Sequence, residues 1–459
     1  MNKTMSRVGM LAVVAVMATA PRPASAAEAD VAAIREEIAA MRADYEARIA
    51  ALEARVAAAE AAASTQQASI ADLSADSAAP LALTLDDGPA PAMAGPATAA
   101  GNALNPGISV VLNGNYFAAS RDLSASRMPG FALGDEAGPP SRGFSLAESE
   151  VTLAANVDPY LNANLTVAFD GQGEAGVEEA YVQTTALPGG LTLKGGRFFS
   201  GIGYLNERHA HNWSFIDMPL PYRALLGNQY GDDGVQVRWL APTDVFLEFG
   251  GEWLRGDSFP AANGANAGTG TQTLFVHTGG DVNASSSWLA AGSWIHAKAD
   301  GRETLDPVFG PDIFSGDTDL GIVSAVYKWA PGGNGVQRNL MLSGEYFFGT
   351  EHGRFNGAPV DVDRAGWYAQ GVYQFMPRWS VGLRYAELKA GDPGAAFAGT
   401  TLDDFGNRSW SATALLEYDS SEFGRFRAQY SRDESDVRAS DQLMLQYTVV
   451  YGPHGAHRY

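Results

Sequence analysis

The chain has 459 residues, of which 52 are Asp or Glu and 31 are Lys or Arg, so its formal net charge is −21. So acidic a chain lacks the basic face that nucleic-acid binding requires, and the absence of cysteine excludes disulfides, thiolate metal sites and cysteine nucleophiles. Its 52 glycines and 10% aromatic residues are typical of a β protein with many turns and with rings at an interface.

The first 26 residues have the pattern of a secretory signal peptide. Lys3 and Arg7 precede an apolar run over 8–20, and Ala24-Ser25-Ala26 supplies the small residues of a cleavage site. The run is too short for a membrane anchor, and no later stretch approaches the ~18 apolar residues of a membrane helix. We therefore predict an exported protein that enters a membrane, if at all, as a closed barrel.

Residues 27–63 are predicted to form a periplasmic coiled-coil helix. Apolar residues recur every three or four positions between Val31 and Ala59, and Asp30 is a natural N-cap. So narrow an apolar seam favours self-association, and we predict a homotrimer; a lone solvated helix is the alternative. Residues 64–106 are rich in Ala, Pro, Ser and Gly without a period, which predicts a flexible linker.

From residue 107 onward, apolar and polar residues alternate. About sixteen segments show this period of two, and most approach the 9–11 residues of a tilted membrane strand. Short turns such as 187–190 and 330–334 alternate with longer polar loops such as 299–316 and 350–363. A soluble sandwich has no reason for this alternation, whereas an outer-membrane barrel has short periplasmic turns and long extracellular loops. The predicted fold class is therefore all-β, a transmembrane antiparallel β-barrel over 107–459.

The last predicted strand carries the most specific local pattern. Leu443, Leu445, Tyr447, Val449 and Tyr451 alternate with polar residues, and the chain ends on Tyr459. In this the sequence resembles the Gram-negative outer-membrane porin superfamily. The resemblance implies that the C-terminal strand and Tyr459 are the assembly signal for the barrel-assembly machinery.

The longest ordered-looking connection, 200–231, is the third long loop. It is rich in bulky residues such as Trp213 and Phe215 that would be unfavourable in water, and Pro219 and Pro221 stiffen it. In porins, which this architecture resembles, the third loop folds into the barrel, so we expect it to form the pore constriction. A loop packed over the barrel mouth or a neighbouring subunit is the alternative. The predicted constriction residues are Glu207, Arg208, His209, His211, Asp217 and Arg223.

Charged residues on the predicted inward face line the expected lumen. Rows of opposite charge in a low-dielectric wall focus the field on a passing solute, although they would equally hydrate and brace the lumen. The net charge of −21 therefore does not decide ion selectivity. The predicted lumen-lining residues are Arg238, Arg378, Arg384, Arg425, Arg427, Glu248, Glu252, Glu345 and Glu417.

Four of the seven histidines form two short motifs, His209-Ala-His211 and His454-Gly-Ala-His457. Neutral imidazoles at such spacing can bind Zn²⁺, and Glu207 or Asp217 could add an oxygen ligand. Because the predicted topology places the motifs on opposite sides of the membrane, we expect no single four-histidine site. No cofactor is expected beyond a weak zinc site, and histidines gathered in a loop by chance are the alternative.

A narrower resemblance rests on GRFFSGIGYLNERHAHNW, GDDGVQVRWLAPTD and the ending GPHGAHRY. These segments resemble a proteobacterial family of plug-less, zinc-related outer-membrane barrels. The chain has no room for the plug domain and some 22 strands of an active transporter. The sixteen-strand layout with an N-terminal helix also resembles phosphate-selective porins, but this sequence lacks a dense lysine ladder.

The predicted function is an outer-membrane porin that lets small polar or charged solutes diffuse through the lumen. One alternative is a zinc-linked uptake protein, and another is an envelope spacer whose coiled coil approaches peptidoglycan. Catalysis is not expected, because no Gly-x-Ser-x-Gly or comparable nucleophile setting accompanies His296 or His352.

Overall fold

A computed structural model describes residues 106–171, 173–264 and 270–452. Within these residues the chain is almost entirely β-structure, with one short α-helix, α2 (Leu220–Leu226). The strands are β1 (Gly107–Ala119), β2 (Gly143–Leu146), β3 (Ser149–Asp158), β4 (Leu161–Phe169), β5 (Ala175–Thr184), β6 (Leu191–Phe199), β7 (Gly231–Leu240), β8 (Phe246–Leu254), β9 (Thr271–Asn283), β10 (Ser286–Asp306), β11 (Gly310–Trp329), β12 (Asn339–Phe355), β13 (Ala358–Met376), β14 (Trp379–Ala390), β15 (Trp410–Ser421), β16 (Gly424–Glu434) and β17 (Ser440–Tyr451). Short 3₁₀ turns that lie wholly within the described residues are Asp135–Ala137, Pro188–Gly190, Ala210–Asn212, Pro331–Gly333 and Ala395–Phe397.

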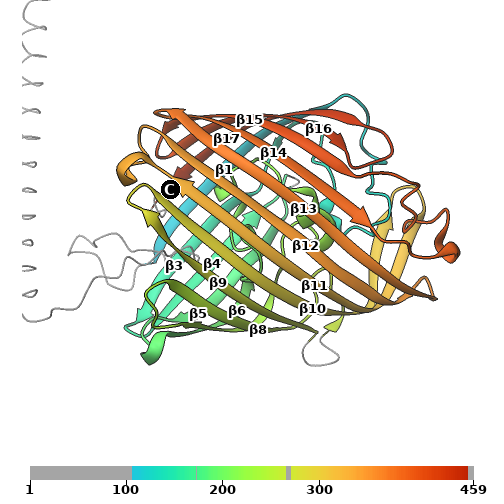
Figure 1. The fold of residues 1–459 in the computed structure, drawn as a ribbon, viewed down its shortest axis with the longest axis horizontal. Coiled ribbons are helices and arrows are strands. Elements are labelled where there is room, and N and C mark those ends of the chain that lie inside the picture. Colours follow the sequence, from blue (N-terminus) through green and yellow to red (C-terminus); the bar gives the residue numbers. More distant parts are fainter. Residues whose placement is uncertain (1–105, 172, 265–269, 453–459) are drawn as a thin grey trace, which may run out of the picture. The chain divides into compact units, whose positions relative to one another are not determined.

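The strands close into one antiparallel barrel (Figure 1). The first strand, β1, pairs with the last, β17, from Val110 opposite Tyr451 to Ala119 opposite Gln442. On its other side β1 pairs with β2 and then with β3. These two short strands therefore occupy a single strand position around the barrel, which we call a stave, interrupted at residues 147–148. The seventeen strands thus make sixteen staves, which confirms the predicted antiparallel barrel of sixteen strands.

Alternation along each strand separates an outward from an inward surface. On β17, for example, Leu443, Leu445 and Tyr447 are exposed, whereas the residues between them are buried. Aromatic pairs lie on the outer surface near both ends of the staves: Trp379 with Tyr418 near the turns, and Tyr385 with Trp410 towards the loops. An outward apolar band between aromatic girdles is the surface that a lipid bilayer covers.

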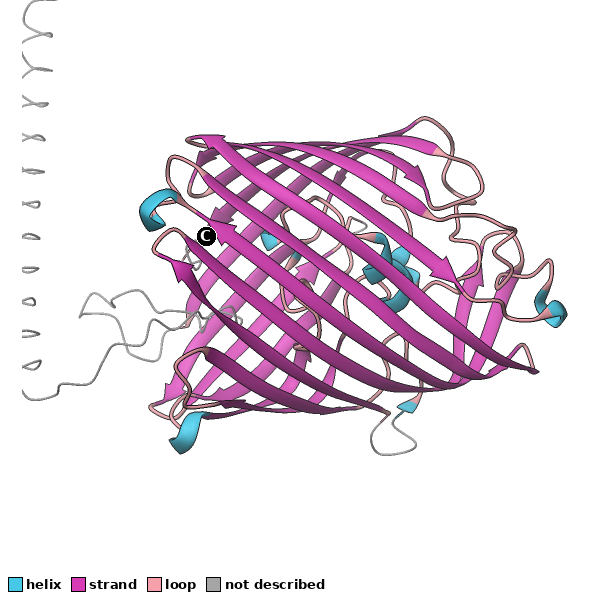
Figure 2. Ribbon diagram, in the orientation of Figure 1, coloured by secondary structure: helices cyan, strands magenta, loops and turns pink. Residues whose placement is uncertain are grey.

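Two predicted extracellular loops are wrong. The ranges 299–316 and 350–363 are mostly β-structure, because β10 and β11 continue their pairing to Asp306 opposite Gly310, and β12 and β13 continue to Phe355 opposite Ala358. The extension preserves backbone hydrogen bonds, so polar residues there mark strands that project past the apolar band rather than loops. Figure 2 shows these long strands as one continuous side of the barrel.

The interior has two kinds of inward surface. One side, which we call the packed wall, presents buried apolar side chains from β10, β11, β12 and β14, namely Ile295, Leu320, Ile322, Phe347 and Leu388. The other side, the polar wall, presents buried polar side chains from β16, β17, β1 and β4, namely Gln429, Gln446, Thr448, Asn113 and Thr166. Both walls keep the same alternation, so they differ only in which residue types face inward.

Several predictions fall outside the described residues: the signal peptide at 1–26, the coiled coil at 27–63, most of the linker at 64–106, the histidines His454 and His457, and Tyr459. Among the described residues, no helix is long and apolar enough to span a bilayer.

Candidate functional site in the barrel lumen

Residues 200–230, hereafter the inserted segment, connect β6 to β7 and lie within the barrel (Figure 2). The segment leaves and re-enters the wall at neighbouring points, where Phe199 pairs with Gly231. Its bulky residues are buried, including Trp213, Met218 and Tyr222, and they pack against the packed wall. The apolar side chains that predicted insertion are therefore the ones that contact the interior.

Glu345 on β12 is the main acceptor for the inserted segment on the packed wall. Its carboxylate accepts hydrogen bonds from the backbone N–H of Tyr204 at 2.7 Å and the hydroxyl of Tyr222 at 2.8 Å. It also accepts from the neighbouring strands, from Ser324 at 2.6 Å and Tyr368 at 2.6 Å. Four donors around one buried carboxylate fix the segment at this point, because each donor would otherwise lack a partner.

Arginines from β14 and β16 hold the middle of the segment. Arg384 on β14 donates to the Asp217 carboxylate at 2.5 Å and to the Asp217 carbonyl at 2.6 Å. Arg427 on β16 donates to the carbonyl oxygens of Trp213 at 2.6 Å and Phe215 at 3.1 Å. Arg425 donates to the carbonyl of His211 and lies 3.7 Å from Glu417. These predicted lumenal arginines face inward, but they bind the inserted segment rather than forming an open row.

A third set of contacts fixes the start of the segment. Arg238 on β7 forms ion pairs with Glu207 and, at 3.4 Å, with Glu248. Glu252 accepts hydrogen bonds from Ser200 and from the backbone N–H of Gly201. Glu207 is thus paired with Arg238, and Asp217 is paired with Arg384. Neither of these predicted oxygen ligands reaches the histidines. That part of the predicted metal site is wrong.

The remaining predicted residues have separate positions. Arg208 lies over the ring of Tyr204, with its guanidinium carbon 4.2 Å from the ring centroid. Arg223 on α2 donates to the carbonyl of Ala137. Arg378 does not line the lumen: it is exposed in the turn between β13 and β14, with φ +71°. A residue in that conformation ends the strand, so the alternation that predicted its inward position does not extend to it.

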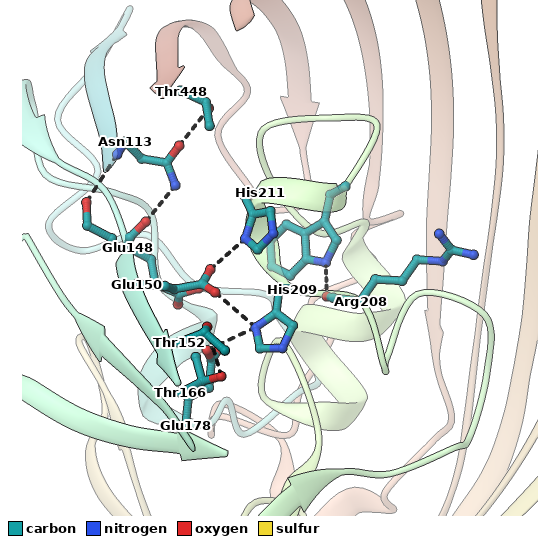
Figure 3. A network of polar contacts seen from close by, with 12 residues as sticks. Asn113, Glu148, Glu150, Thr152, Thr166, Glu178, Arg208, His209, His211 and Thr448 are labelled. Atoms are coloured by element: carbon teal, nitrogen blue, oxygen red, sulfur yellow. Dashed lines mark hydrogen bonds and ion pairs between the residues drawn. The ribbon is translucent and has the colours of Figure 1, made fainter. Parts of the chain in front are cut away.

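His209 and His211 meet three glutamates from the barrel wall, of which Figure 3 shows Glu150 and Glu178. Nδ1 of His209 lies 3.2 Å from Glu150 on β3 and 3.2 Å from Glu178 on β5, while its Nε2 lies 3.0 Å from Glu179. Nδ1 of His211 lies 2.9 Å from the other oxygen of Glu150. The two imidazole rings are stacked, with centroids 5.7 Å apart. This histidine–glutamate cluster joins the inserted segment to the second and fourth staves.

Strand irregularities explain how so many carboxylates reach one place. The register of β4 and β5 shifts between Thr166 and Val167, so that Glu178 has no partner of its own and Glu178 and Glu179 both contact His209. Strict alternation would place consecutive residues on opposite faces, whereas a β-bulge breaks this rule. Sequence reasoning missed these glutamates for that reason; the paired Glu178-Glu179 within an alternating segment was the available signal.

The charges of the barrel wall shift the pKa values of His209 and Asp217 in the inserted segment. Burial favours the neutral form of His209, but the carboxylates of Glu150 and Glu178 outweigh this and raise its pKa well above the ordinary value. Burial opposes ionisation of Asp217 as well, yet Arg384 and the hydrogen bond from Gln429 lower its pKa. In both cases charged side chains of the barrel wall favour the ionised form of the segment residue.

The chain is 30% identical over 339 residues to a protein of Aquifex aeolicus (strain VF5) described as "Uncharacterized protein", a match that covers 69% of this chain and 70% of the relative. The chain belongs to the same family as this Aquifex protein. No protein-family model matches the chain.

Solved outer-membrane proteins resemble the structure at low sequence identity. A loop L8 deletion mutant of OmpT, an outer membrane protein of Vibrio cholerae, has a TM-score of 0.49 at 12% identity, covering 76% of this chain and 100% of that chain. An anion-selective porin from Comamonas acidovorans has a TM-score of 0.48 at 10% identity, covering 75% and 99%. The outer membrane channel DcaP of Acinetobacter baumannii has a TM-score of 0.46 at 13% identity, covering 76% and 97%.

Proposed function

We propose that the protein is an outer-membrane porin through which small polar or charged solutes diffuse. The observation that carries the proposal is a closed barrel with an apolar outer band, aromatic girdles and an interior in which one wall is polar. A closed barrel satisfies every backbone group of its wall in lipid, and polar inward residues replace part of the hydration of a solute.

The inserted segment constricts the route. Because its bulky residues cover the packed wall, we expect the solute path to run on the side of the polar wall. Charged groups near this path are few, since most lumenal arginines are paired with the segment. We therefore expect a low conductance with modest ion selectivity.

Planar-bilayer recording of the purified full-length protein tests this function. Folding is verified first, by the shift in electrophoretic mobility that a closed barrel shows between unheated and heated samples. We expect small, long-lived conductance steps, together with liposome swelling in small sugars that ceases as the sugars become larger. Folded barrels that insert into the bilayer without conductance steps would overturn the proposal.

We also propose assembly as a homotrimer in the outer membrane, inserted by the barrel-assembly machinery through β17 and the C-terminal residues. The proposal rests on the alternation of β17 and on the seam over 27–63 in the sequence. Chemical cross-linking in native membranes should give a trimer in the full chain and a monomer after deletion of residues 28–63. A trimer that survives the deletion would place the interface on the barrel instead.

A further inference from the structure

We propose that the histidine–glutamate cluster binds one divalent transition-metal ion through Glu150, Glu178 and Nδ1 of His209. This goes beyond solute diffusion, and its ligands differ from the histidine and acidic residues that the sequence suggested. The three ligand atoms come from β3, β5 and the inserted segment, and all lie within 4.8 Å of one another.

The spacing of these atoms suits a small ion. Nδ1 of His209 is 3.2 Å from the nearest oxygen of Glu150 and 3.2 Å from that of Glu178. Two ligands that are each about 2.0–2.1 Å from a tetrahedral Zn²⁺ lie roughly 3.3 Å apart. An ion can therefore enter between the ring and the two carboxylates with little displacement of the side chains. Figure 3 shows the carboxylates of Glu150 and Glu178 directed at the same edge of the His209 ring.

The second nitrogen of His209 has the partner that metal-binding histidines require. Nε2 lies 3.0 Å from Glu179, whose other oxygen accepts a hydrogen bond from the backbone N–H of Phe199 at 3.3 Å. When the Nε2–H of a ligating histidine donates to a carboxylate, Nδ1 remains unprotonated and its basicity rises. Glu179 is thus a positioning residue for the ring rather than a ligand.

His211 positions a second ligand, the carboxylate of Glu150. Its Nδ1 lies 2.9 Å from Oε1 of Glu150, and the metal-facing oxygen is Oε2. This contact orients the Glu150 carboxylate with one oxygen towards His209. Three protein ligands leave one position for water, which is the arrangement of exchangeable rather than closed structural zinc sites.

Bound metal would replace the proton that His209 otherwise shares with the glutamates, and would tie the inserted segment to the second and fourth staves. The site lies at the join between a strand bulge and the segment, so only the assembled barrel presents all three ligands.

Metal binding is measured on the full-length folded protein in detergent, with Zn²⁺ as titrant in calorimetry and metal content after equilibrium dialysis. We expect one Zn²⁺ per chain in wild type, and loss of this site in Glu178→Gln and in His209→Ala. Glu179→Gln should retain the site with about 10–100-fold weaker affinity, as expected for a partner outside the ligand set. Replacing Zn²⁺ by Co²⁺ should give a visible absorption band of a tetrahedral site.

Two controls separate this site from other histidines. His277→Ala removes a histidine that contacts Glu248 at 3.2 Å outside the cluster, and a His454→Ala, His457→Ala double variant removes the C-terminal motif. Both should bind Zn²⁺ as wild type does. Equal binding by all variants, loss of binding in a control alone, or no binding by wild type would overturn the assignment.

Each variant is first tested for closed-barrel electrophoretic mobility, with Glu178→Gln chosen because it preserves side-chain shape. Binding in detergent does not depend on conductance, so this result and the bilayer result can fail separately.

Discussion

The packed wall and the polar wall come from strands of the same kind, yet they differ in what they do. On the packed wall, Ile322 and Phe347 are covered by the inserted segment, and Glu345 gathers four hydrogen bonds at its centre. On the polar wall, Thr448 donates to Asn113 at 2.6 Å within the wall, and Gln429 accepts from the backbone N–H of Ile216 at 2.9 Å in the segment. Alternation fixes which residues face inward, and their chemistry decides whether that side holds the segment by apolar packing or by polar contacts.

The contacts of the lumenal arginines also explain why net charge has a limited role in ion selectivity. The lumenal arginines Arg384 on β14 and Arg427 on β16 both hold the inserted segment. Because these charges are neutralised or bonded to carbonyl groups, they contribute little to the field that a passing ion meets.

The largest effect is expected from Glu345→Ala. Four donors would lose their acceptor, two of them on the inserted segment, and leaving buried donors unpaired costs about 1–3 kcal/mol each. The segment should detach from the packed wall, so that single-channel conductance becomes noisy and rises roughly twofold or more. The matched control is Ser343→Ala on the same inward face, since the Ser343 hydroxyl has no hydrogen-bond partner among the described residues. A quiet, unchanged conductance in Glu345→Ala would show that the Glu345 carboxylate does not hold the segment.

The next effect concerns the ion pair between Asp217 and Arg384. The Arg384 side chain is buried and that of Asp217 is partly buried, so removing one partner leaves a poorly compensated charge, at a cost below the about 3–5 kcal/mol of a fully buried pair. We expect Asp217→Ala and Arg384→Ala each to increase the open-state probability, and the double variant to fall short of the sum of the two. The ratio of open to closed dwell times measures this coupling. Additive effects in the double variant would mean that the two residues act independently.

A smaller effect is expected from Tyr368→Phe. The change removes one donor to Glu345 and leaves the three others in place. A hydrogen bond to a charged group contributes about 1.5–3 kcal/mol, so flicker should increase only slightly and the main conductance level should stay unchanged. Bilayer recordings of Tyr368→Phe and Glu345→Ala under the same conditions compare their conductance levels and flicker. An effect as large as that of Glu345→Ala would indicate that Tyr368, rather than the carboxylate, is the centre of the contact.

The smallest change is expected from Arg425→Gln, and it concerns selectivity. Arg425 is half-buried on the inward face, so its loss should shift the reversal potential in a salt gradient modestly towards cations. Arg378→Gln is the matched control, because Arg378 is exposed in a turn at the end of the barrel. Equal shifts in both variants would place the selective charge outside the lumen.

The barrel could be predicted from the sequence because a period of two and alternating connection lengths are repeated along the whole domain. The extended hairpins at 299–316 and 350–363 could not, since polar residues are equally compatible with a loop and with a strand beyond the apolar band. The packed wall was also missed. Its signal was present in segments such as 317–330, where Leu320 and Ile322 accompany an outward row that is apolar as well.

The candidate site was predictable in part. The composition of 200–231 indicated insertion, and inward arginines were named correctly except for Arg378. Their partners could not be foreseen, because they depend on where the segment meets the wall. The glutamates beside His209 required a β-bulge at Glu178, and a register shift leaves little trace in a single sequence.

The anchoring of the inserted segment has a consequence for the order of folding. Its ends are neighbours in the wall, but its contacts reach from Glu150 on β3 to Arg427 on β16, which are far apart in the chain. The complete set of these contacts is present only when both ends of the sheet surround the segment, so it carries the loop-closure entropy of the whole barrel. The inserted segment is therefore fully anchored only in the closed barrel.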